Sequence, residues 1–120
     1  MQKSNVTSGF SVLCLASALF SGHAVAEEAR EASSGQHLFE FHGCGNCHGT
    51  GGKNPVSKIV PVLAGKPGDE LHEKATQILS GDASSDEAKL MHAAVYSAAS
   101  CNAPPTDAEI KAITSWLAAQ

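Results

Sequence analysis

The sequence has 120 residues, which suffices for one small domain. Its formal net charge is −4, from 8 basic and 12 acidic side chains, and no stretch concentrates lysine or arginine. This balance excludes the basic surfaces that bind nucleic acids or anionic membranes, and it favours an acidic surface that meets a basic patch on a partner protein.

The N-terminus predicts a cleaved secretory signal. Lys3 gives a short positive start, residues 10–20 are mostly apolar, and Ala24-Val25-Ala26 provides small side chains for cleavage. The apolar run is too short to span a bilayer, so we expect a periplasmic or otherwise exported protein without a membrane anchor after cleavage near Ala26. The expected division is a signal peptide at 1–26, a flexible lead-in at 27–34 and one domain at 35–120.

A short helix is predicted to lead into a pair of cysteines. Ser33 or Ser34 can cap a helix that carries Leu38 and Phe39, and this helix must end near Gly43. The cysteines follow at once, so their position is set by the end of this helix.

The stretch Cys44-Gly45-Asn46-Cys47-His48 has the spacing of the c-type haem attachment motif. Each thiol adds across one haem vinyl group, and a two-residue spacer lets both thioethers reach the same edge of the macrocycle. His48 is then carried to the iron as the proximal ligand. The motif predicts one covalently bound haem c, attached at Cys44 and Cys47.

Two other classes of site share part of this pattern. The motif with Gly49 and Gly51 also fits one zinc repeat of the J-domain co-chaperones, but a tetrahedral zinc needs four ligands and such repeats work in pairs. A thioredoxin-like dithiol would need a βαβ pattern, which the chain lacks. Both remain minor alternatives.

After a glycine-rich loop that begins at His48, two amphipathic helices are predicted. Asp69 can cap the first, and Gly81 stands where a C-terminal glycine belongs. Ser84 or Ser85 can cap the second, which carries Leu90, Met91, Ala94, Val95 and Ala98 before the break at residues 101–105.

The last helix has the best-defined start. Thr106 and Glu109 form a capping box, and its apolar face consists of Ile110, Ile113, Trp116 and Leu117. No stretch alternates well enough to predict a strand. The sequence therefore predicts an all-α domain of about four short helices and long loops, and a haem would supply apolar surface that so short a chain lacks.

These features resemble a class I cytochrome c over nearly all of residues 33–120. Gly35, Leu38 and Phe39 match the family's N-terminal helix, in which a glycine allows close crossing by the C-terminal helix. Trp116 has the place of the aromatic residue on that C-terminal helix. The resemblance implies the small cytochrome c fold wrapped around a single haem.

The loop after the motif carries a further part of the resemblance. Pro61, Leu63 and Gly65 match the family's loop, whose proline carbonyl receives a hydrogen bond from the proximal histidine. In this chain that histidine is His48. The resemblance thus implies that Pro61 fixes the tautomer of His48 and strengthens its donation to iron.

The distal ligand is less well defined. In the family it is usually a methionine shortly before the final helix, and Met91 is the one methionine left after signal removal. Met91 lies farther from the last helix than in many relatives, and it also fits an apolar helix face. His92, an open position, or an atypical ligand such as Cys101 or Asn102 are the alternatives.

Other residues are expected to be structural. His37, His42 and His72 have no partner at metal-ligand spacing, and we expect them at the surface or at helix ends. We also expect an apolar wall around the haem that excludes water. Its members are Leu38, Phe39, Val62, Leu63, Leu90, Val95, Ile110, Ile113 and Trp116.

The sequence predicts a one-electron carrier, not an enzyme, that meets its redox donor and acceptor in transient contacts. A haem protein with an open or labile sixth position, which binds a gas or small anion, is the first alternative. A cytochrome subunit of a periplasmic dehydrogenase is the second. Cys101 is an odd thiol in an exported protein, so a disulfide-linked dimer is a further hypothesis.

Overall fold

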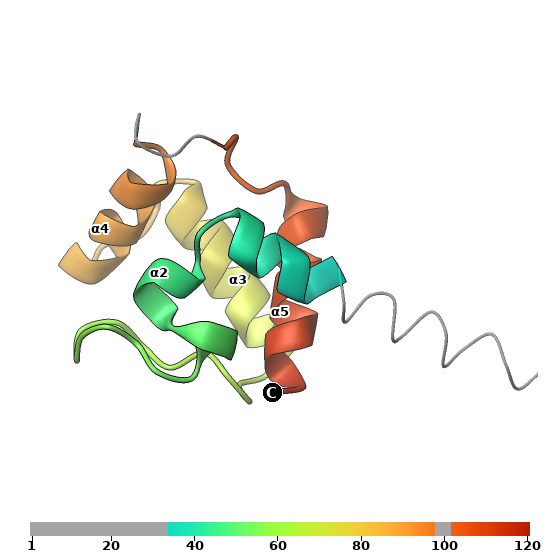
Figure 1. Ribbon diagram of the computed structural model, residues 1–120. Coiled ribbons are helices and arrows are strands. Elements are labelled where there is room, and N and C mark those ends of the chain that lie inside the picture. Colours follow the sequence, from blue (N-terminus) through green and yellow to red (C-terminus); the bar gives the residue numbers. More distant parts are fainter. Residues whose placement is uncertain (1–33, 98–101) are drawn as a thin grey trace, which may run out of the picture.

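The computed structural model describes residues 34–97 and 102–120, and this part of the chain is helical, without strands (Figure 1). The predicted signal peptide and Cys101 lie outside the described residues. None of the described helices is long and apolar enough to cross a membrane. The all-α prediction is confirmed. The elements are a first helix at 34–41, α2 (Gly45–His48), the 3-10 turn η1 (Thr50–Gly52), α3 (Gly68–Leu79), α4 (Asp86–Val95) and α5 (Asp107–Ala118).

The core lies where the first helix and α3 pack against α5. Gly35 is buried against α5, where an added Cβ would come within 2.4 Å of both the Ala112 carbonyl oxygen and the Trp116 Cβ. One turn later the rings of Phe39 and Trp116 meet at 5.4 Å between centroids. The glycine therefore allows the close approach that lets these rings pack, as the sequence predicts. The buried cluster comprises Phe39, Leu71, Ile113, Trp116 and Leu117.

The ends of α3 agree in part with the prediction. Pro67, not Asp69, holds the N-cap position, and Asp69 lies in the first turn, where its charge complements the helix dipole. Proline suits the start of a helix, because it has no backbone N–H that needs a partner and its fixed φ is compatible with the helix that follows. At the other end Gly81 adopts φ +84°, and its N–H and that of Asp82 bond to Ile78 and Gln77, which closes the helix in a Schellman motif.

Helix α4 begins as predicted and ends earlier. The Ser85 hydroxyl accepts a hydrogen bond from the Ala88 N–H and caps the helix. The helix stops at Val95, before the predicted break at residues 101–105. The Tyr96 hydroxyl donates to the Leu79 carbonyl, 3.0 Å away at the end of α3. This hydrogen bond holds Tyr96, the C-cap residue of α4, against the end of α3, which gives a physical reason for the early end of α4.

The capping box of α5 is present. Thr106 Oγ1 accepts a hydrogen bond from the Glu109 N–H at 3.3 Å, and the Glu109 carboxylate accepts from the Thr106 N–H at 2.8 Å. The Thr106 N–H and the Thr106 hydroxyl both donate to the Glu109 carboxylate, and these bonds, with a smaller contribution from His42, hold the pKa of Glu109 below its usual value.

The lowered pKa of Glu109 predicts an acid-sensitive contribution to stability. A carboxyl whose folded-state pKa is depressed stabilises the fold above its unfolded pKa, and that stabilisation is lost as the pH falls through the folded value. We expect the free energy of unfolding of Glu109→Gln to fall less steeply than that of the parent protein between about pH 5 and about pH 3. Urea unfolding at a series of pH values measures this. An acid limb as steep in the variant as in the parent protein contradicts it.

Candidate haem site

The cysteine motif forms one helical turn. The Cys44 carbonyl accepts from the His48 N–H at 3.0 Å, and the Gly45 carbonyl accepts from the Gly49 N–H at 2.9 Å. Residues three and four apart lie on one face of a helix, so this turn brings Cys44, Cys47 and His48 to the same side. Gly49 ends the turn with φ +76°. The sequence alone did not predict this turn or the following η1, because both are short and rich in glycine.

Neither thiol of the motif forms a disulfide. Cys44 is half-buried and packs against the core cluster, whereas Cys47 is exposed. Burial raises the pKa of the Cys44 thiol to about 11. A reactive dithiol needs an easily formed thiolate, so this environment disfavours that alternative. The described residues also contain no group of three or more His, Cys, Asp or Glu side chains that could hold a metal ion.

His48 is held in one tautomer by the loop that follows it. Its side chain is buried, with 7 % of the residue exposed, and Nδ1 lies 3.0 Å from the Pro61 carbonyl oxygen. A carbonyl oxygen only accepts, so Nδ1 carries the proton and Nε2 keeps a lone pair for a metal. The contact that the resemblance implied for Pro61 is therefore present in the structure. The assignment of His48 to an iron remains a prediction.

Backbone hydrogen bonds return the loop to the motif. The Val56 N–H donates to the Cys47 carbonyl at 2.9 Å, and the Leu63 N–H donates to Gly52 at 2.9 Å. Gly49 has no room for a side chain, since a Cβ would come within 2.0 Å of the Asn54 carbonyl oxygen. These contacts fix the course of the chain on both sides of Pro61.

Apolar side chains of the loop and of α4 remain exposed on the polypeptide. Val62 and Leu90 were expected in an apolar wall around the haem, and in the part of the chain that the structure describes they are 44 % and 59 % exposed. Val56 and Ile59, in the same loop, are exposed as well. Figure 1 shows α2, the loop after it and α4 all to the left of α5. These side chains offer apolar contacts of the kind that a haem face needs, so the residues present fit a haem.

The contacts of the distal candidates differ. Met91 is half-buried on α4. His92 Nδ1 lies 2.9 Å from the Ile78 carbonyl at the end of α3, and its ring packs on Tyr96. The Asn102 side-chain amide donates to the Phe41 carbonyl. The Asn102 amide is thus engaged in a structural hydrogen bond, whereas the bond at His92 Nδ1 leaves Nε2 with a lone pair, as at His48. Met91 stays the predicted distal ligand, and His92 stays an alternative.

His42 was expected at the surface or at a helix end. It lies just after the first helix, and its side chain is buried, with 6 % exposed. It faces Glu109 on α5. Sequence reasoning missed this because a histidine so near a helix end carries no periodic signal for burial.

Comparison with known proteins agrees with this geometry. A family model described as cytochrome c matches residues 32–120, which is 89 of the 120 residues and includes every described helix. Comparisons with curated proteins and with solved structures gave no significant match. The matched family binds haem c covalently, and the motif, the orientation of His48 and the packing of Gly35 agree with it. The chain therefore belongs to the cytochrome c family.

Proposed function

We propose that this cytochrome c carries single electrons between larger redox proteins outside the cytoplasm, with one haem per chain. The observation that supports this most directly is the contact between His48 Nδ1 and the Pro61 carbonyl. It orients the imidazole and leaves Nε2 as a strong donor, which suits a permanently ligated iron. Membership of the family supports the haem, and the carrier role is our inference from the ligand set.

The residues around the site have distinct roles in this proposal. Cys44 and Cys47 would hold the haem through thioethers, and His48 and Met91 would ligate the iron. The bound haem supplies a one-electron couple of iron. With His48 and Met91 both bound to the iron, neither oxidation state would bind substrate, and the ligand set would change little on transfer. A methionine ligand favours the ferrous state and raises the potential.

The partner contact is proposed to be small and short-lived. Three helix starts carry acidic side chains in their first turns, at Asp69 and Glu70 on α3, Asp86 and Glu87 on α4, and Asp107 and Glu109 on α5. Such charges steer a basic partner into contact at low ionic strength without forming a tight complex. Rapid separation is needed for turnover, so a weak interface suits a carrier.

A redox titration of the purified haem protein tests the proposal. We expect one haem per chain by intact mass and a reversible wave that fits a one-electron change. Electron exchange with a basic redox protein should slow as salt is added, because screening weakens the steering. A second haem, an irreversible wave or tight co-purification with a dehydrogenase would contradict the carrier role.

A further inference from the structure

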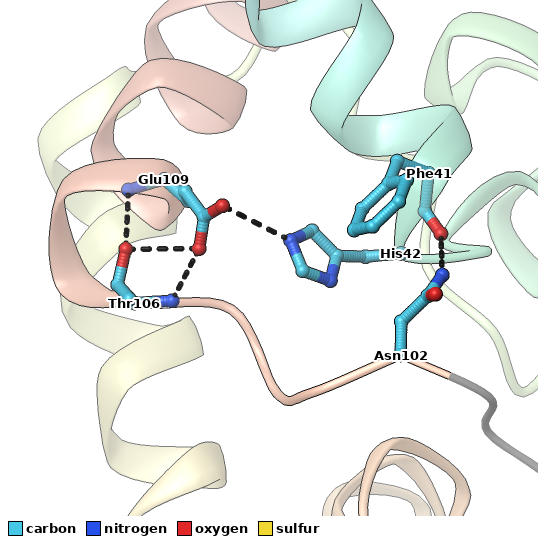
Figure 2. A network of polar contacts seen from close by, with 5 residues as sticks. All are labelled: Phe41, His42, Asn102, Thr106 and Glu109. Carbon is cyan, nitrogen blue, oxygen red and sulfur yellow. Dashed lines mark hydrogen bonds and ion pairs between the residues drawn. The ribbon is translucent and has the colours of Figure 1, made fainter.

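The end of the first helix and the start of α5 meet through two ionisable side chains. His42 Nε2 lies 3.7 Å from Glu109 Oε1, and the side chains are 6 % and 32 % exposed (Figure 2). The distance is too long for a hydrogen bond, and His42 Nε2 has no hydrogen-bond partner among the described residues. A buried polar atom without a partner is unfavourable, so this nitrogen calls for a structural explanation.

The Glu109 carboxylate is set up to receive a proton donor. One oxygen, Oε2, accepts from the Thr106 N–H at 2.8 Å and from the Thr106 hydroxyl at 2.9 Å. The other oxygen, Oε1, points at His42. The capping box thus holds a carboxylate in place with one oxygen left for the histidine.

We propose that His42 and Glu109 form a proton-dependent clamp between the first helix and α5. When the imidazole is protonated, both ring nitrogens donate, and a small movement of either side chain makes a charge-assisted hydrogen bond to Oε1. When the imidazole is neutral, it has no charge to attract the carboxylate, and the contact adds little to the stability of the fold. The clamp is a property of the fold and does not rest on the electron-carrier proposal.

Among the described residues, Glu109 is the ionisable group that contacts His42. The Phe41 ring packs edge-on against the His42 ring at 5.1 Å between centroids and is uncharged. Asn102, whose amide donates to the Phe41 carbonyl, is neutral too. His37 stacks on Phe41 at 6.2 Å, but no contact joins it to Glu109. A second pair, His72 and Asp107, links α3 to α5 elsewhere.

The clamp connects two segments that matter for the site. His42 lies two residues before Cys44, so its Cα is within about 7.6 Å of the Cys44 Cα by chain geometry. Glu109 lies in the first turn of the helix that carries Trp116. A closed clamp therefore ties the attachment motif to α5 at a point beyond the crossing at Gly35.

A double-mutant cycle on the haem-loaded protein tests this clamp. Glu109→Gln removes the charge, and a glutamine still completes a capping box. We expect Glu109→Gln to raise the unfolding equilibrium constant by about three- to tenfold more at about pH 5.5 than at about pH 8, where imidazole is neutral. In a His42→Gln background this extra effect should vanish. Urea unfolding followed by circular dichroism gives the four constants at each pH.

Matched controls separate the clamp from other titrations. His37→Gln removes an exposed histidine of the same helix and should leave the pH dependence of Glu109→Gln unchanged. The His72–Asp107 pair is present in all four proteins and cancels in the cycle. An equal effect of Glu109→Gln at both pH values, or a pH difference that persists without His42, would overturn the proposal. If His42→Gln does not fold, the effect of Glu109→Gln at the two pH values still tests the proposal, because an equal effect at both would overturn it.

Discussion

Replacing Gly35 by alanine is expected to destabilise the haem-loaded protein by about 3 kcal/mol or more, at the upper end of overpacking costs in cores. The new Cβ would lie 2.4 Å from the Ala112 carbonyl oxygen and 2.4 Å from the Trp116 Cβ. Neither can move alone, because one is backbone and the other begins a buried side chain. The first helix must then separate from α5, and the contact of Phe39 with Trp116 loosens. Urea unfolding measures the loss.

Gly45→Ala is the matched control for this effect. Gly45 lies in α2, and an added Cβ would meet Phe39 Cε1 at 3.5 Å, an ordinary van der Waals contact. Alanine is also the better helix former, so we expect a change within about 1 kcal/mol. Equal stability of Gly35→Ala and the parent protein would show that the two terminal helices do not cross as closely as the structure places them.

Replacing both Cys44 and Cys47 by serine is expected to abolish covalent haem attachment. A hydroxyl does not add to a vinyl group as a thiol does, so the doubly substituted chain can form no thioether. Each single variant keeps one thiol and should retain haem through one thioether, at lower yield. A denaturing gel stained for haem, with intact mass, distinguishes chains that carry covalent haem from chains that do not, and the stain intensity gives the yield. Expression must take place in cells competent in haem attachment.

Cys101→Ser supplies the control for thiol loss in general. Cys101 lies outside the described residues and outside the motif, so this variant should carry haem as the parent protein does. The same variant tests the dimer hypothesis, since a reductant-sensitive dimer on a non-reducing gel should disappear. Covalent haem in the chain without Cys44 and Cys47 would refute the attachment site.

The features predictable from sequence are those that depend on neighbours in the chain. The capping box at Thr106 and the apolar face of α5 were predicted, since both depend on residues three or four apart. The stop at Gly81 was predicted for the same reason. The cysteine motif is itself local, so the attachment site could be predicted before any fold was known, and it stays a prediction.

The features that were missed depend on contacts between distant segments. His42 is buried where it faces Glu109, 67 residues later, and no local pattern encodes this contact. Helix α4 ends at Val95, where the Tyr96 hydroxyl reaches the end of α3. Pro67, not the predicted Asp69, is the N-cap residue of α3, so this helix begins two residues earlier than predicted and Asp69 falls in its first turn.

The most direct test of the proposed site is the visible spectrum of the purified protein, ferric and ferrous, before and after carbon monoxide. The proposal predicts a low-spin spectrum, a sulfur-to-iron charge-transfer band in the ferric state, and no response to the gas. Met91→Ala should remove the band and admit carbon monoxide, whereas His92→Ala should do neither. A high-spin spectrum, or gas binding by the unsubstituted protein, would contradict ligation by Met91 and favour an open sixth position.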